Sequence, residues 1–272
     1  MIRRVVCLLR GGLGNQLFQI CNIAILSRSL EANFYISDLN TFHLQRGLGG
    51  TESLSLPISE LFPEHASLHV LNSKSRLFVK FLMATSNRLD VPKVLNESHD
   101  YFSKLPRLSL LEGYFQDKTI VNQIPIASLN RVFPRAHVKS NINKVANRVC
   151  LHIRRRDYPK SITQQFGSEY YRKAVQKFQN LGFTKFDCYS DDLSAAQEIL
   201  SFLPESQKHF PETQVTLDSI SLLQEMAMYK NFILSQSSLV WWASYIAFRN
   251  DSKVRIEGKL SSLLDFRNSH VL

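Results

Sequence analysis

Three arginines and an aspartate follow an apolar segment near the middle of the chain and could bind a strongly anionic group. The apolar segment, 149–153, is followed directly by Arg154, Arg155 and Arg156, with Asp157 next. In open α/β sheets, ligands bind beyond the carboxyl ends of strands. Arginine also matches phosphate oxygens with a planar, bidentate set of donors. The pattern therefore predicts a site for a group such as a pyrophosphate, and a solvated basic loop is the alternative.

The alternation of side chains along an extended segment divides these residues between two sides. His152, Arg154 and Arg156 would share one side if the strand continued. Arg155 and Asp157 would share the other side. We expect Asp157 to hold Arg155 there by a charge-assisted pair.

A glycine-rich segment near the start of the chain, Gly11-Gly12-Leu13-Gly14-Asn15-Gln16, is a second candidate site. Glycines let a backbone approach a ligand closely, and a helix N-terminus directs N–H groups towards an anion. The dinucleotide fingerprint GxGxxG is absent. A ligand site and a tight turn without a ligand both remain open from these residues alone.

Polar residues also follow the next predicted strand, in the segment Ser190-Asp191-Asp192. Three interpretations are open. The two carboxylates could bind a metal, they could cap a helix N-terminus, or they could hydrogen-bond to a base or ribose.

A third strand end carries hydroxyl groups just before a predicted helix. Ser235, Ser237 and Ser238 lie there, and Trp241 and Trp242 follow. Hydroxyls at a helix N-terminus form a cradle for an anion. We expect the two tryptophans to be core residues that hold this helix in place.

The elements that position these residues alternate between short apolar runs and amphipathic segments, which predicts an α/β fold with parallel sheets. We expect two Rossmann-like domains that face a cleft, at residues 1–140 and 141–272.

Residues 40–70 are predicted to be irregular. Residues 73–89 form a basic amphipathic candidate, either a core-packed helix with a solvated basic face or a membrane-surface helix. The segment around Pro125 and Pro134 is poorly patterned. The predicted strands are 5–9, 34–36, 109–113, 149–153, 185–189, 232–234 and 253–256, and the predicted helices are 15–30, 170–180, 194–202, 219–229 and 237–248.

Composition narrows the class of protein. The 272 residues are 44% hydrophobic, which is typical of a globular chain, and the formal net charge of +10 favours anionic partners. The four cysteines lie in apolar stretches and are expected to be buried, reduced thiols; no spacing suits zinc. The first apolar run is too short for a signal peptide or a membrane span, and no later run is long enough. We therefore expect a cytoplasmic protein.

Taken in order, the motifs resemble those of the α-1,2-fucosyltransferases, glycosyltransferase family 11. The segment from Gly11 to Gln19 resembles the N-terminal signature of that family, and the segment from His152 to Tyr158 resembles its H-x-R-R-G-D-Y motif. Three further segments look like its other signatures, and they are 113–116, 189–192 and 235–242.

The resemblance implies a GT-B-like fold, GDP-fucose as donor, inversion at the anomeric carbon and no required metal or other cofactor. It makes Arg154 the catalytic group that contacts the donor phosphates. The other residues expected to bind substrates are Gly12, Gly14, Asn15, Gln16, His152, Arg155, Asp157, Asp191, Ser235, Ser237 and Ser238.

Two positions depart from the pattern of the family. Arg156 replaces the usual glycine, and Ser221 stands where an acidic residue is expected, with Asp218 as a substitute. No general base could be selected among Asp38, Glu112 and Asp117.

The resemblance also predicts the partners of the protein. The expected acceptor is a galactose-terminated glycan of the kind that is built on a lipid carrier, in a pathway that makes surface polysaccharide such as O-antigen. A basic surface would suit peripheral contact with the inner membrane. A glycosyltransferase that uses another nucleotide sugar or linkage is the alternative. Nucleic-acid binding is not expected, because the arginines follow a buried strand rather than alternating with exposed aromatic residues.

Overall fold

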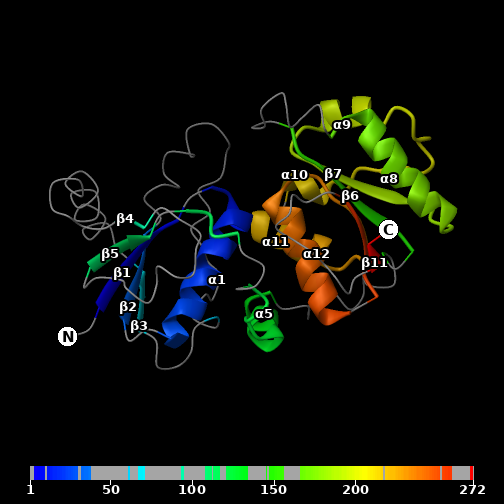
Figure 1. Cartoon of the computed structure of the whole chain (residues 1–272). Helices are drawn as coiled ribbons and strands as arrows, with labels where there is room; N and C mark the ends of the chain where they lie inside the picture. Colours follow the sequence, from blue (N-terminus) through cyan, green and yellow to red (C-terminus); the bar gives the residue numbers. More distant parts are fainter. Residues whose placement is uncertain are drawn as a thin grey trace. The chain divides into compact units, whose positions relative to one another are not determined.

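The computed structural model divides the chain into two compact units, Met1–Val132 and Phe133–Leu272 (Figure 1). The predicted domain boundary at residue 140 falls between residues 134 and 144, outside the described part of the chain. The structure describes residues 3–9, 11–29, 32–37, 61, 67–70, 93–94, 108–111, 113–116, 121–133, 145, 147–155, 166–216, 218–251, 253–258 and 270–271.

The N-terminal unit contains a parallel sheet in the order β3-β2-β1-β5-β4. Its strands are β1 Arg3–Leu8, β2 Ala32–Ser37, β3 Ser67–Val70, β4 Lys93–Val94 and β5 Leu108–Leu111. The prediction that residues 40–70 are irregular is wrong for β3, which extends the sheet beside β2. A four-residue strand at the sheet edge is too short to show a clear pattern in the sequence.

Two described helices belong to this unit, α1 (Leu13–Ser29) and α5 (Ile126–Val132). Gly14 and residues 16–27 of α1 are buried, so this helix is covered all round and not only on the predicted apolar face. The segment that begins at Pro125 was predicted to be poorly patterned, but it opens α5. Proline is tolerated there because the first N–H groups of a helix have no partner within it. The Pro125 carbonyl accepts hydrogen bonds from Ser128 and Leu129.

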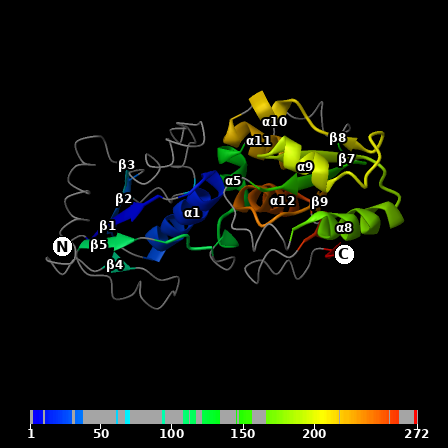
Figure 2. The same ribbon diagram turned by 90° about the horizontal axis from the view of Figure 1, so that it is seen from above.

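The C-terminal unit has a second parallel sheet, in the order β11-β10-β9-β6-β7-β8. Figure 2 shows β7, β8 and β9 of this sheet with the helices of the unit around them. Its strands are β6 Val149–Ile153, β7 Phe186–Ser190, β8 Lys208–His209, β9 Asn231–Ile233, β10 Arg255–Glu257 and β11 His270–Val271. The parallel α/β fold is confirmed, and the bounds predicted for β6 are confirmed residue by residue.

Helices lie on both faces of the C-terminal sheet. They are α8 Ser168–Asn180, α9 Leu193–Ile199, α10 Thr213–Thr216, α11 Ser219–Met226 and α12 Ser238–Asn250. Val149, Leu151 and Ile153 point to the face where α8 and α9 complete an apolar core. Asp187 and Tyr189, alternate residues of β7, point to the other face. Tyr189 hydrogen-bonds there with Glu225 of α11, and Asp187 with Tyr229, which follows α11.

Each sheet has a point where the chain reverses the direction in which it adds strands. In the N-terminal unit this point lies between β1 and β5, and in the C-terminal unit between β6 and β9. Loops diverge at such a point and leave a crevice beyond the carboxyl ends of the strands. The segments that follow these four strands are therefore the first places to examine for a site.

The described residues also bear on two predictions made from composition. The four cysteines are free and buried, as predicted. Among the helices that the structure describes, none combines the length and the apolar character needed to cross a membrane.

Candidate functional site

A hydrogen bond joins the ends of β6 and β9 at the reversal point of the C-terminal sheet. His152 lies near the end of β6, and Ser235 follows β9 after Leu234; Nδ1 of His152 and Oγ of Ser235 lie 2.7 Å apart. Both side chains are buried. The structure thus brings together two of the residues that the sequence predicted for the site.

The imidazole of His152 is neutral at physiological pH. Burial, and to a smaller extent the positive charge of Arg154, lower its pKa from the ordinary value of 6.5 to about 3. A neutral ring has one N–H donor and one acceptor nitrogen. If Nδ1 donates to Ser235, Nε2 is an acceptor, and if Nδ1 accepts from Ser235, Nε2 is a donor.

Two consecutive tyrosines of α8 anchor these strand ends from the other side of the sheet. The hydroxyl of Tyr171 donates a hydrogen bond to the His152 carbonyl at 3.0 Å. The hydroxyl of Tyr170 donates to the carbonyl of Leu234. The backbones of β6 and β9 are therefore held in place where they deliver His152 and Ser235.

The arginines that follow β6 are held by Asp191, which follows the neighbouring strand β7. Oδ2 of Asp191 lies 3.1 Å from Nε of Arg154, and its Oδ1 accepts a hydrogen bond from the backbone N–H of Arg155 at 2.8 Å. The side chain of Arg155 turns to the carbonyl of Phe166, at 2.8 Å. Both arginine side chains are partly exposed at the carboxyl edge of the sheet.

The two aspartates after β7 have different roles. Asp192 is the N-cap of α9 and accepts a hydrogen bond from the Ala195 N–H at 3.1 Å, whereas Asp191 binds the arginine segment. Of the three interpretations, helix capping is therefore confirmed for Asp192. No three His, Cys, Asp or Glu residues in the described part of the chain are placed to hold a metal ion.

Asp218, the suggested substitute for an acidic residue at Ser221, is also a helix cap. Its carboxylate accepts a hydrogen bond from the Ser221 N–H at 2.7 Å and begins α11. The two positions singled out from the sequence are thus in direct contact.

The serines before α12 lie at the start of a well-packed helix. Ser237 is the N-cap residue, and its hydroxyl makes no capping hydrogen bond. Ser238 begins the helix. Trp241 and Trp242 are buried, with ring centroids 5.1 Å apart in an edge-to-face arrangement, which confirms that they are core residues.

The N-terminal unit has a comparable polar contact at its own reversal point. Asn15 follows β1 and Gln116 follows β5; Nε2 of Gln116 donates to Oδ1 of Asn15 at 2.9 Å. Phe115 lies in the left-handed region, with φ of 49° and its ring buried, a strained conformation for a residue with a side chain. This turn directs Gln116, a residue that the predicted site did not include, towards Asn15.

The glycine-rich turn after β1 is built around Gly11 and Gly12. Gly11 has φ of +74°, and a Cβ there would lie 2.6 Å from Nδ2 of Asn15, so only glycine fits. The Gly12 carbonyl accepts hydrogen bonds from the N–H groups of Asn15 and Gln16, and Nε2 of Gln16 donates to the Gly11 carbonyl at 2.8 Å. Gly12 is exposed, whereas Gly14 is buried inside α1.

Some predicted residues lie outside the described part of the chain. They include Arg156 and Asp157, so the predicted pairing of Asp157 with Arg155 stays a prediction. The candidate bases Asp38, Glu112 and Asp117 and the basic segment 73–89 also lie outside it.

A further side chain, Gln214 of α10, braces the end of β7. Its Oε1 accepts a hydrogen bond from the Ser190 N–H at 2.8 Å, and its Nε2 donates to the Cys188 carbonyl at 3.3 Å. The edge strand β8 pairs only with Phe186 and Asp187. Gln214 therefore replaces the missing edge strand just before Asp191, and no local pattern in the sequence could have shown this.

This fold and the polar strand ends are those of a GT-B-like α/β protein. The crystal structure of the fucosyltransferase NodZ from Bradyrhizobium is similar with a TM-score of 0.51 and 10% sequence identity, and the match covers 89% of this chain and 91% of NodZ. A NodZ structure soaked with GDP-fucose, in which the enzyme is described as an α-1,6-fucosyltransferase, matches with a TM-score of 0.46 and 9% identity over 90% of this chain and 93% of NodZ.

Sequence comparison gives the family. The model for glycosyl transferase family 11 matches residues 100–262, and the chain belongs to this family. The matched region includes the segments around His152, Asp191 and Ser235. The O-antigen biosynthesis glycosyltransferase WbnK of Escherichia coli is 25% identical over 278 aligned positions, which cover 88% of this chain and 88% of WbnK.

Proposed function

We propose that this protein is an inverting glycosyltransferase that transfers L-fucose from GDP-fucose to the 2-hydroxyl of a terminal galactoside. The observation that carries the proposal is the fixed position of Arg154 beside the reversal point of the C-terminal sheet, where Asp191 holds its Nε. A guanidinium has five N–H donors, so the same group can bind both Asp191 and phosphate oxygens.

The reaction breaks the bond between C1 of fucose and the β-phosphate oxygen, and the electron pair leaves with GDP. The transition state resembles an oxocarbenium ion, as in other glycosyl transfers. Arg154 would stabilise the charge that develops on the pyrophosphate, together with the N–H groups and hydroxyls at Ser237 and Ser238. His152, Arg155 and Asp191 would shape the nucleotide site, and Asn15 and Gln16 are proposed as further substrate-binding residues.

The choice of fucose and of a surface glycan is supported by membership in family 11 and by the known proteins that the chain resembles. NodZ, which has the same type of fold, is a fucosyltransferase. WbnK belongs to O-antigen biosynthesis. The 2-hydroxyl linkage is supported by the motif from His152 to Tyr158 and by its companions along the chain.

The decisive experiment is incubation of the protein with GDP-fucose and a set of β-galactosides that includes lactose. The expected product carries an α-fucosyl unit on O2 of galactose, identified by its NMR cross-peak between fucose H1 and galactose H2. Fucose found on another hydroxyl would overturn the linkage, and no transfer to any galactoside would overturn the acceptor class.

The identity of the donor can be tested separately by thermal unfolding in the presence of nucleotides. A ligand that binds only the folded protein raises its melting temperature. We expect GDP to give a larger increase than UDP or CMP at equal concentration. Equal or greater protection by UDP or CMP would favour a glycosyltransferase with another nucleotide sugar.

We also propose that transfer requires no metal ion, because the arginines can supply the positive charge that a divalent cation would otherwise place beside the pyrophosphate. Fucosyl transfer should then be unchanged in 5 mM EDTA, within about the factor of two that separates repeat assays. Loss of activity in EDTA that returns with Mg²⁺ or Mn²⁺ would overturn this part of the proposal.

The proposed location is the cytoplasm, with peripheral contact to the inner membrane through basic surface and a lipid-linked acceptor. The net charge of +10 supports this placement. The protein should co-sediment with vesicles that contain anionic lipid at low salt and be released at high salt, because the attraction is electrostatic. Equal binding to vesicles of neutral lipid would contradict it.

A further inference from the structure

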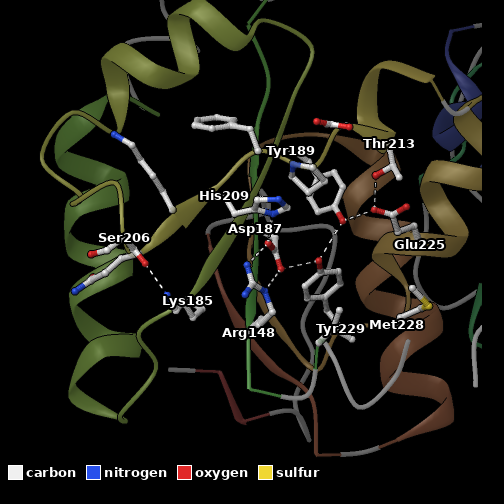
Figure 3. Close-up of a pocket in the computed structure, with 16 residues that line it drawn as sticks. Arg148, Lys185, Asp187, Tyr189, Ser206, His209, Thr213, Glu225, Met228 and Tyr229 are labelled. Atoms are coloured by element: carbon white, nitrogen blue, oxygen red, sulfur yellow. Dashed lines mark hydrogen bonds and ion pairs between the residues drawn. The ribbon is translucent and has the colours of Figure 1, made fainter. Parts of the chain in front are cut away.

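A pocket of about 900 Å³ opens in the C-terminal unit, away from the proposed donor site (Figure 3). Arg148 and Lys185, which precede β6 and β7, line it, as do His209 of β8 and Glu225 near the end of α11. The proposed donor site lies beyond the opposite, carboxyl ends of these strands. Asp187, at the base of the pocket, and Asp191 are four residues apart, which corresponds to about 13 Å along an extended chain. Tyr189 lies between them and lines the side of the pocket nearest to Asp191 in sequence.

Asp187 forms the base of the pocket, and all of its hydrogen-bonding capacity is used within the protein. Arg148 binds it with two nitrogens, the hydroxyl of Tyr229 donates to Oδ2 at 2.8 Å, and Nδ1 of His209 lies 2.8 Å from Oδ1. Burial opposes ionisation of Asp187, but these hydrogen bonds outweigh it and lower the pKa of the carboxyl group. Asp187 is therefore an ionised carboxylate that organises its neighbours.

The contact with Asp187 determines how His209 faces the pocket. An ionised carboxylate only accepts hydrogen bonds, so Nδ1 of His209 carries the proton. Nε2 is then the ring nitrogen left for a ligand. The His209 side chain is 59% exposed, so this nitrogen is accessible from the pocket.

Glu225 presents an acceptor. Its Oε1 takes hydrogen bonds from the hydroxyls of Tyr189 at 2.7 Å and Thr213 at 2.8 Å. These two bonds orient the carboxylate and leave Oε2 as the oxygen that can accept from a ligand. Figure 3 shows Glu225 and His209 on the walls of the same pocket.

The cations of the pocket are engaged with acceptors of the protein. Arg148 is bound to Asp187, Nζ of Lys185 donates to the Ser206 carbonyl at 2.7 Å, and Nζ of Lys208 lies 2.7 Å from a carboxylate oxygen of Glu205. An anion would thus have to compete with these contacts, whereas a cation would be repelled by the same three side chains. A neutral ligand with several hydroxyls, each of which can donate and accept, suits His209 Nε2 and Glu225 Oε2.

We propose that this pocket binds a neutral sugar unit, at a site separate from the one where fucose is transferred. The volume is within the range of small-ligand pockets and accommodates one or two sugar rings. The choice of a sugar over another polyol rests on the proposed function, whereas the binding can be measured without donor or transfer.

Methionine methyl NMR on the full chain provides a site-specific test. The chain has four methionines; Met228 lines the pocket, while Met226, two residues earlier, is fully buried and does not line it. Methyl β-galactoside and lactose, added to the protein without GDP-fucose, should shift the Met228 methyl signal in a saturable way and leave Met226 unchanged. Inorganic phosphate and ethanolamine at the same concentrations should not shift it.

Two variants identify the groups responsible for binding. His209→Ala removes the exposed ring nitrogen, and Glu225→Gln replaces the carboxylate but keeps an oxygen for Tyr189 and Thr213. Each should weaken sugar binding at Met228 at least about threefold, which is what one ordinary hydrogen bond contributes. The matched control Glu198→Gln, on the exposed side of α9, should bind sugar as the wild-type protein does.

The result can contradict the proposal in two ways. A Met228 shift with phosphate or ethanolamine and none with sugar would assign the pocket to a charged ligand. No saturable shift with any sugar up to 50 mM, a limit of roughly 2 kcal/mol of binding energy, would remove the site. Either result leaves the fucosyl-transfer assay untouched, so the two proposals fail independently.

Discussion

The carboxylate of Asp191 holds the side chain of Arg154 and the backbone of the residue after it. One oxygen lies 3.1 Å from Nε of Arg154, and the other accepts the Arg155 N–H at 2.8 Å. The contacts connect the segments that follow two adjacent strands, β6 and β7. The side chains of Arg154 and Asp191 are 30% and 19% exposed, so solvent screens the attraction between their charges only in part. The direction of the hydrogen bond therefore contributes to the strength of the contact as well as the charges.

Asp191→Asn should lower kcat/KM for GDP-fucose by about 10- to 100-fold, because a hydrogen bond to a charged group contributes roughly 1.5–3 kcal/mol. The protein should remain folded, since an amide oxygen can still accept from one partner. Asp192→Asn is the matched control. Asparagine caps a helix as well as aspartate does, so its steady-state kinetics should stay within about twofold of wild type. Similar losses in both variants would contradict the separate roles of the two aspartates.

Arg154→Ala should lower kcat by at least about 100-fold, the scale seen when one fixed donor to a developing negative charge is removed. Arg154→Lys keeps the charge but has no planar set of donors that can bind Asp191 and phosphate together, so it should recover only part of this loss. Single-turnover rates at saturating GDP-fucose measure the effect on the chemical step. Near-normal turnover of the alanine variant would remove the role assigned to Arg154.

His152 should make the free energy of unfolding depend on pH. Its folded pKa of about 3 lies below the ordinary 6.5, so the unfolded chain binds a proton that the folded protein excludes. The stabilising contribution is complete above pH 6.5 and is lost as pH falls from 6.5 towards 3, by about 1.4 kcal/mol per pH unit. Urea unfolding at pH 7, 5.5 and 4.5 should show this slope in the wild-type protein in excess of His152→Gln. Equal slopes would show that the imidazole is protonated normally in the folded state.

The sequence predicted elements well where many residues repeat one pattern. The five buried residues of β6 and the periodic residues of α8 and α12 are examples, because burial of one continuous face or run decides their conformation. β8 and α10, of two and four residues, are too short to carry a period and were not predicted. α5 was not predicted either, because Pro125 is typical of a break as well as of the start of a helix.

The candidate site was predicted as a set of residues but not as a set of contacts. Alternation along one strand led to Asp157 as the expected partner of an arginine, since a local pattern relates only neighbours in sequence. The described partner of Arg154 is Asp191, 37 positions away, and the partner of His152 is Ser235. Such pairs depend on the order of strands in the sheet, which places β7 and β9 on either side of β6.

The cysteines should be unreactive in the folded protein. Burial raises the pKa of the Cys7 thiol to about 12 and does the same for Cys188, so neither forms the reactive thiolate at pH 8. Cys21 and Cys150 are shifted in the same direction by the same cause. A thiol reagent such as dithionitrobenzoate should modify none of the four promptly under native conditions and all four in guanidinium chloride. Prompt modification of one thiol in the native protein would contradict its burial.

Gln214 should act on the reaction through the segment that carries Asp191. Its amide bonds to Ser190 and Cys188 take the place of an edge strand where β8 has ended, and Asp191 is the next residue after Ser190. Gln214→Met keeps the length and most of the shape of the side chain but removes both hydrogen bonds. The loss should destabilise the fold by about 1–2 kcal/mol, because one backbone N–H and one carbonyl lose their partners.

The same variant should also lower kcat more than it raises KM for the acceptor, since the displaced group is the support of Arg154 and not an acceptor contact. Gln176→Met, at an exposed position of α8, is the matched control and should leave both constants unchanged. If Gln214→Met is less stable but has wild-type kcat at a temperature where it is fully folded, the brace serves the fold alone. If kcat is reduced under those conditions, α10 positions the catalytic arginine from the far edge of the sheet. The melting curve of the control Gln176→Met should be unaltered.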